Sequence, residues 1–309
     1  MRIAVETWSP DYGAPVGDEA LDPSTTEVDE SVEVPIDHWR PLAAEAGTEP
    51  IDDLLFVDGV RRVEAHVWIT DDQGVDRQGI CASYAAGAVH CNGSARLVEA
   101  RVERVLLAPP PGDALVTRHG TFAFAEAPTD DPGRLPLVLQ ERMGALEAEV
   151  VRAAPDHQLV VVDGPLKRGQ IEPGSVGYVK THRQAYGQPV VRETLTALAV
   201  GERTPLLHIT GDERIAPRYT WYLRLPGPIR HGWAGIVRLE AAASAPAASV
   251  IVLADRLCVT LGRFASTEQK DPRAPQNLYP VGGLERELRR RLGDPMLLYR
   301  ALRRAQSVA

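Results

Sequence analysis

Two segments of the same form carry most of the information about the fold: Leu159-Val160-Val161-Val162-Asp163-Gly164 and Leu54-Leu55-Phe56-Val57-Asp58-Gly59. Each is an apolar run without alternation, which is typical of a strand buried on both faces. Each ends in a carboxylate followed by glycine, and a buried carboxylate is costly unless it is paired or binds a cation. We interpret the two as strand ends that share one site for a hard cation. Considered alone, each segment fits an ordinary structural turn better than it fits a cation site.

The composition is that of a soluble globular protein. The chain has 309 residues, of which 44% are hydrophobic and 25% charged, enough for one large domain or two modest ones. The first ten residues lack the apolar run of a secretion signal, and no apolar stretch approaches the roughly 18 residues of a membrane span. The three cysteines show no CxxC spacing, so neither a disulfide framework nor a zinc site is indicated. We expect a cytoplasmic protein without a membrane partner.

Acidic residues are concentrated near the N-terminus. The net charge is −8, but residues 1–60 hold fifteen Asp and Glu against two Arg, which leaves the other 249 residues net positive. Many of the acidic residues lie between Asp18 and Asp37. This segment is either an arm that covers a basic surface or meets a partner, or a solvated surface segment. Because the rest of the chain is basic, a nucleic-acid partner remains compatible with the charge.

The first third of the chain reads as a β-meander. Alternating apolar residues predict a half-buried strand over 61–69, so the first strand is expected to end at Asp58. A turn at 71–74 and a returning strand over 80–89 follow, and 97–107 is a further strand or a helix. Beyond the meander, apolar spacing predicts a helix over 136–154. Later strands are expected over 176–182, 206–209, 220–225 and 235–240, and helices over 247–264, 281–292 and 295–306.

A meander, a helix and then a strand with a second carboxylate is the order of ribonuclease-H-like nucleases. We therefore expect an α/β fold with a ribonuclease-H-like mixed central sheet flanked by helices and a C-terminal helical extension. The predicted organisation is a single domain over 1–309, with an acidic N-terminal arm (1–50), a catalytic sheet core (51–225) and a C-terminal strand and helices (226–309). The helix offers a third carboxylate. Of Glu141, Glu147 and Glu149, Glu147 borders the apolar face and is our choice.

These segments resemble the NurA nuclease family. The likeness is carried, in the family's order, by short segments at 56–59, 139–147, 160–166 and 176–180, and by Tyr279-Pro280 with the helix after it. The resemblance implies a ribonuclease-H-like DNA exo- and endonuclease that favours Mn²⁺ over Mg²⁺ and forms a homodimer. It also implies a HerA-type hexameric ATPase as partner in DNA end processing and double-strand break repair.

The resemblance also implies roles for individual residues. Asp58 and Asp163 match the family's metal-binding aspartates, Glu147 its helix glutamate, and Lys180 its basic residue. Such a set would hold two Mn²⁺ or Mg²⁺ ions about 3.5–4 Å apart for in-line hydrolysis. Lys180 would neutralise the scissile phosphate or position water, or it is only a strand-edge surface lysine. The family's His on the helix after Tyr-Pro is missing here, and Glu285 or Glu287 is a candidate substitute.

Basic residues near the same strand ends are candidates for binding the DNA backbone, namely Lys167, Arg168 and Arg183. The Arg-rich tail is either a phosphate-contacting face or a solvated helix side. Other enzyme classes find little support, since the sequence has no GxxxxGK[ST], GxSxG or HExxH motif. The alternative function is a catalytically impaired ribonuclease-H-like scaffold that bridges DNA and an ATPase. The missing His and the acidic arm keep this alternative open.

Overall fold

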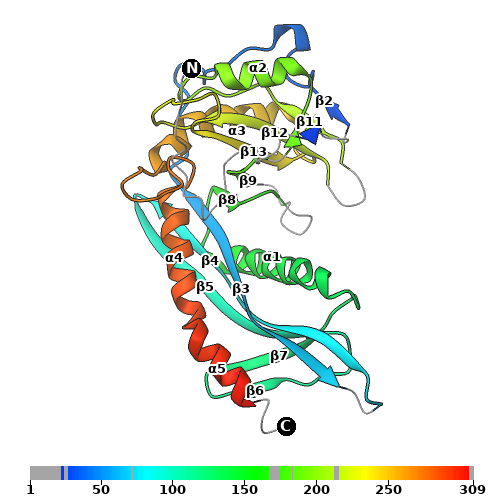
Figure 1. Cartoon of the computed structure of the whole chain (residues 1–309). Helices are drawn as coiled ribbons and strands as arrows, with labels where there is room; N and C mark the ends of the chain where they lie inside the picture. The colour runs from blue at the N-terminus through cyan, green and yellow to red at the C-terminus, as the bar shows by residue number, and fades with distance from the viewer. Residues whose placement is uncertain are drawn as a thin grey trace. The chain divides into compact units, whose positions relative to one another are not determined.

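The protein is a mixed α/β protein (Figure 1). Its structure is a computed structural model that describes residues 22–23, 27–70, 73–166, 174–182, 184–211 and 216–305. The chain forms two compact units and passes between them several times: the first comprises 1–56, 90–96 and 156–282, and the second 57–89, 97–155 and 283–309. The predicted α/β class is confirmed, whereas the single-domain organisation stays a prediction.

The first unit contains a mixed sheet. Its strand order is β2 (Val28–Asp29), β11 (Leu207–Ile209), β12 (Arg218–Arg224), β13 (Ile236–Ala242), β9 (Ser175–Val179) and β8 (Leu159–Asp163). Neighbouring strands are antiparallel except β8 and β9, which are parallel. Two-residue strands β1 (Asp22–Pro23) and β10 (Gln184–Ala185) form a separate parallel pair. The helices of this unit are η2 (Ile36–His38), α2 (Pro189–Ala197), α3 (Ala247–Thr260) and η5 (Leu261–Phe264).

The second unit is built on three long strands, β3 (Leu54–Thr70), β4 (Asp76–Asn92) and β5 (Ser94–Ala108), followed in the sheet by β7 (Gly120–Glu126) and β6 (Leu115–Thr117). The start of β3, the end of β4 and the start of β5 belong to the first unit. On the sheet lie η3 (Pro132–Arg134), α1 (Leu135–Ala153), α4 (Tyr279–Leu292) and α5 (Pro295–Ala305). Close packing of α4 requires Gly87, because a Cβ there would lie 2.9 Å from Leu284.

The predicted strand end at Asp58 is wrong. β3 is 17 residues long and runs through Asp58 and Gly59 without a break. Gly59 is not among the glycines with positive φ. Its missing side chain makes room for α1 instead, since a Cβ would lie 2.5 Å from Glu147 Oε1 and 2.9 Å from Met143 Cγ. At Gly164 the same dipeptide does end a strand: φ is +101° and β8 stops at Asp163, as predicted.

Most other predicted elements are present with small shifts of their ends. The helix expected over 136–154 is α1, and the terminal helices are α4 and α5. The segment 97–107, left open as strand or helix, is strand β5. The strand expected over 176–182 ends earlier, at Val179, so Lys180 follows it. The elements β6, β7 and α2 are absent from the prediction.

The described part of the acidic segment is bound to the first unit. β2 pairs with β11, and the Glu33 carboxylate accepts bonds of 2.8 and 2.9 Å from Arg203. Glu33 also accepts the backbone N–H of Leu206 at 2.8 Å, and Arg203, only 2% exposed, donates to Asp255 at 2.7 Å. The basic group that Glu33 covers is therefore one of this unit's own buried arginines.

Candidate active site

Asp163 is the centre of the candidate site in the first unit. It is the last residue of β8, opposite Tyr178 of β9 in the parallel pair. Its Oδ2 accepts a bond of 2.6 Å from the ammonium of Lys180, which follows β9. Its Oδ1 is buried and has no hydrogen-bond partner among the described residues. One carboxylate oxygen is thus neutralised, and the other is enclosed without a donor.

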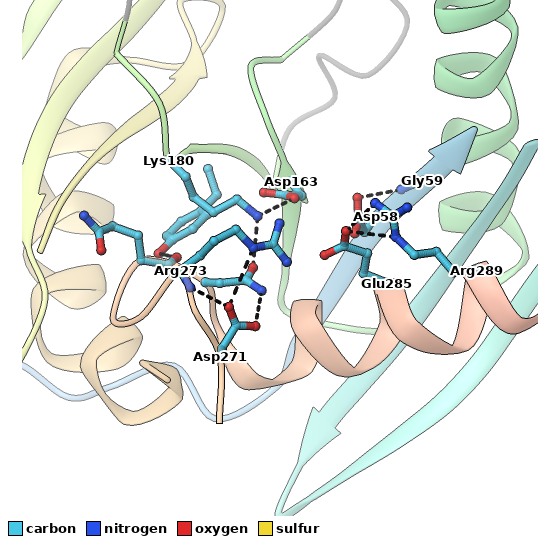
Figure 2. Close-up of polar contacts among 11 residues, drawn as sticks. Asp58, Gly59, Asp163, Lys180, Asp271, Arg273, Glu285 and Arg289 are labelled. Carbon is cyan, nitrogen blue, oxygen red and sulfur yellow. Dashed lines mark hydrogen bonds and ion pairs between the residues drawn. The ribbon is translucent and has the colours of Figure 1, made fainter. Parts of the chain in front are cut away.

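Lys180 belongs to a longer chain of polar contacts (Figure 2). Its ammonium also donates to Asn277 Oδ1 at 3.0 Å, and Asn277 Nδ2 donates to Asp271 Oδ2 at 2.7 Å. Asp271 Oδ1 accepts the backbone N–H of Arg273 at 2.8 Å. Sequence reasoning missed Asn277 and Asp271, because neither lies in a motif and both are remote in sequence from Lys180.

The turn after Asp163 is held against β9. The N–H of Gly164 donates to the carbonyl of Tyr178 at 2.8 Å. A Cβ at Gly177 would lie 2.9 Å from Leu166 N, so only glycine admits the turn there. Burial and the nearby Asp163 charge raise the pKa of Tyr178 well above its ordinary value. The phenol therefore stays protonated and donates to the Gln276 carbonyl at 2.6 Å.

Two carboxylates of the second unit belong to the predicted set. Asp58, on β3, is 7% exposed, and its Oδ1 accepts the backbone N–H of Gly59 at 2.7 Å. Glu147, on α1, is 3% exposed and faces Gly59. Glu141 and Glu149 are exposed, and Glu149 pairs with Arg101 at 3.2 Å. Of the three helix glutamates, Glu147 is the one directed at the sheet, as expected.

The two candidates for the missing His differ in their surroundings on α4. The Glu285 carboxylate is largely buried, pairs with Arg289 at 2.8 Å, and points toward Asp58 in Figure 2. Glu287 is bound by the exposed side chains of Arg290 and Arg291 at 2.7 and 2.8 Å. Hydrogen bonds from Arg290 and then Arg291 lower the pKa of Glu287 to about 2. Of the two, Glu285 has the surroundings of a site residue.

The predicted residues therefore fall into two groups. Asp163 and Lys180 are brought together in the first unit, and Asp58 lies next to the glycine that Glu147 faces in the second. Lys167, Arg168 and Arg183 lie outside the described residues. Over the described ranges, no group of three or more His, Cys, Asp or Glu side chains is placed to hold a metal ion. No helix in those ranges is long and apolar enough to cross a membrane.

Comparisons with known proteins place the chain in no family. No family model matches it, and no curated protein matches it. Among solved structures it is similar to Endonuclease V of Ciona intestinalis, crystallised with DNA that contains an inosine followed by a ribo-adenosine. The TM-score is 0.35 and the sequence identity 10%, over 82% of this chain and 90% of that one. A likeness of this degree carries no argument about fold or function.

Proposed function

We propose that the protein is a metal-dependent deoxyribonuclease that hydrolyses phosphodiester bonds on a ribonuclease-H-like fold, with Mn²⁺ or Mg²⁺ as cofactor. The observation that carries this proposal is the carboxylate of Asp163, whose Oδ2 is bound to Lys180 and whose Oδ1 is buried without a hydrogen-bond partner in the described part of the chain. A buried acceptor without a donor is unfavourable, and such exceptions call for an explanation. A cation bound to Oδ1 would explain why this oxygen has no donor.

The donor atoms of the predicted ligands are of the kind that a hard divalent cation prefers. The predicted set of Asp58, Glu147 and Asp163 offers only carboxylate oxygens, the ligands that Mg²⁺ and Mn²⁺ prefer. Asp58 and Glu147 are largely buried, which is compatible with a role as ligands of an enclosed cation. Soft thiolate ligands compete little, since burial raises the pKa of each of the three cysteines to about 11 or 12.

The spacing along two strands supports the assignment of both aspartates to one site. The first residues of β3 belong to the first unit, where β3 follows β8 in the strand order. Just before both strands begin, the N–H of Gln158 donates to the carbonyl of Asp53 at 3.2 Å. Asp58 and Asp163 each come five residues after that pair.

Each residue has a defined task in this proposal. Asp58, Glu147 and Asp163 would hold the cation, with Glu285 in the place of the family's His. The bound cation supplies a more acidic water and stabilises charge on the leaving oxygen. The Lys180 ammonium stays on Asp163 Oδ2 and offsets negative charge where a phosphate would bind. Lys167, Arg168 and Arg183 are proposed contacts to the DNA backbone.

The proposed setting is DNA end processing in the cytoplasm, as a homodimer with a HerA-type hexameric ATPase. This part rests on the resemblance, and it fits a sequence without a phosphate-binding GxxxxGK[ST] motif, which we do not expect to hydrolyse ATP itself. Size-exclusion chromatography of the two purified proteins should give one complex. Separate elution at micromolar concentrations would argue against the partnership.

Cleavage of labelled DNA tests the proposed activity. The wild type with Mn²⁺ should cut single- or double-stranded DNA, while Asp163→Asn and Glu147→Gln should not. Glu149→Gln is the matched control, because Glu149 lies on the same helix but is exposed. Wild-type protein that cuts no DNA, with or without the ATPase, would leave the impaired scaffold as the better description. The Lys180–Asp163 ion pair, which neutralises a ligand, is the observation that favours that second candidate.

A further inference from the structure

We infer that Asn277 and Asp271 are positioning residues that hold Lys180 on one oxygen of Asp163 and so keep the other oxygen available to a cation. The inference rests on the proposed function and adds two residues to it. Both precede α4 in the first unit and are buried, with Asn277 fully inaccessible to solvent. Polar side chains in such a place are retained at a cost in desolvation, which their hydrogen bonds offset.

The partners of Asn277 fix the orientation of its amide. Its Oδ1 accepts from the Lys180 ammonium at 3.0 Å, and its Nδ2 donates to Asp271 Oδ2 at 2.7 Å. An ammonium can only donate and a carboxylate can only accept. If the amide turned over, it would set its N–H groups against Lys180 and its oxygen against Asp271. The carboxylate of Asp271 therefore ensures that an acceptor faces Lys180.

Asp271 is itself held in place. Its Oδ1 accepts the backbone N–H of Arg273 at 2.8 Å, and Arg273 Nε lies 3.6 Å from the same oxygen. These contacts fix the carboxylate and balance its buried charge. The order of groups is then carboxylate, amide, ammonium, carboxylate, from Asp271 to Asp163 (Figure 2).

The consequence for Asp163 follows from the two acceptors of Lys180. With one donor direction taken by Asn277, the ammonium contacts Oδ2 alone, at 2.6 Å, and leaves Oδ1 without a donor. Without the Asn277 acceptor, the ammonium is free to move across both oxygens of Asp163. A cation would then compete with Lys180 for Oδ1, so its affinity would fall.

The test is Mn²⁺ binding by the full chain without DNA, measured by electron paramagnetic resonance titration, together with thermal melting. Asn277→Leu should raise the dissociation constant of Mn²⁺ about tenfold or more, as outer-shell substitutions do. The control is Thr204→Val, which removes the hydroxyl that accepts the N–H of Tyr222 at 3.1 Å at a fully buried position of the same unit. It should melt earlier and bind Mn²⁺ as the wild type does.

A second set of variants covers the case in which Asn277→Leu does not fold. Asn277→Asp sets two carboxylates against each other and should weaken both folding and Mn²⁺ binding. Adding Asp271→Asn exchanges the two groups, so that an amide again donates to a carboxylate that faces Lys180, and binding should recover. Equal Mn²⁺ affinity in the single and double variants would overturn the inference.

Mn²⁺ binding by the wild type separates a structural role of Asn277 from the absence of a metal site. If the wild type and Asn277→Leu bind Mn²⁺ equally well and the variant only melts at a lower temperature, Asn277 has a structural role alone. The nuclease proposal would then be unaffected. Wild-type protein that binds no Mn²⁺ at all would overturn the proposed function and this inference with it.

Discussion

Glu147 occupies the space that a side chain at Gly59 would need, because its Oε1 lies 2.5 Å from the position of a Cβ on Gly59. Met143 fills the rest of that space at 2.9 Å. The missing side chain therefore sets how closely α1 approaches β3. It also brings a buried glutamate next to the residue that follows Asp58, which makes the strand and the helix one support for two of the proposed ligands.

We expect Gly59→Ala to lower the free energy of unfolding by about 1–3 kcal/mol, the usual range for overpacking. Mn²⁺-dependent cleavage should fall as well, because Glu147 must move. Gly283→Ala is the matched control: nothing lies within 4 Å of its Cβ position, and in a helix alanine is favoured over glycine by about 0.5–1 kcal/mol. Urea denaturation measures both, and equal stability of Gly59→Ala and wild type would contradict the close approach.

The two glutamates of α4 should differ in their effects on activity. Glu285→Gln should weaken Mn²⁺ binding at least about tenfold and reduce cleavage, since a ligand should matter no less than an outer-shell group. Glu287→Gln should leave both unchanged, because its carboxylate is held by exposed Arg290 and Arg291. Isothermal titration with Mn²⁺ and cleavage assays of both variants decide the matter. Indistinguishable variants would remove Glu285 from the proposed site.

The stability of the protein should depend on pH through His182. Its ring is buried, with Tyr222 and Trp233 ring centroids at 5.7 and 5.2 Å. Burial and then the Arg238 charge lower the pKa of His182 from 6.5 to about 3. Between these values the unfolded chain binds a proton that the folded protein does not. Stability is therefore complete above pH 6.5 and falls toward pH 3, by up to about 1.4 kcal/mol for each pH unit.

Urea denaturation at several pH values measures this slope. His182→Gln should be less stable at neutral pH, because ring packing is lost, but its stability should fall less steeply between pH 6.5 and pH 3. A variant with the wild-type slope would show that other groups cause the acid sensitivity.

Removal of one partner from the ion pair of Glu33 and Arg203 should destabilise the first unit. Glu33→Ala leaves a buried arginine with one carboxylate partner fewer, and we expect a loss of roughly 3 kcal/mol. Asp37→Ala, in the same acidic segment but exposed, should have little effect. Scanning calorimetry of the two variants and the wild type compares their melting temperatures. Unchanged melting of Glu33→Ala would mean that the segment is only loosely bound.

Much of the fold could be read from neighbouring residues. The unbroken apolar runs before Asp58 and Asp163 are buried strands, and the three- and four-residue spacing of apolar side chains over 136–154 is helix α1. Burial on one face leaves a period in the sequence, and burial on both faces leaves an unbroken apolar run, so the sequence shows either one directly. The same helical period distinguishes Glu147 from Glu141 and Glu149, because Glu147 borders the apolar face.

Local patterns therefore identify most of the long elements and their core-facing residues, but they leave 97–107 open between strand and helix. The different fates of Asp58-Gly59, which continues a strand, and Asp163-Gly164, which ends one, depend on tertiary contacts. The two dipeptides are identical, and the difference lies in what surrounds each glycine: Glu147 and Met143 lie against Gly59, and nothing lies within 4 Å of the Cβ position at Gly164. Asn277 and Asp271 were hidden for the same reason. Their meaning comes from Lys180, almost a hundred residues away, and contacts over such separations leave no periodic trace.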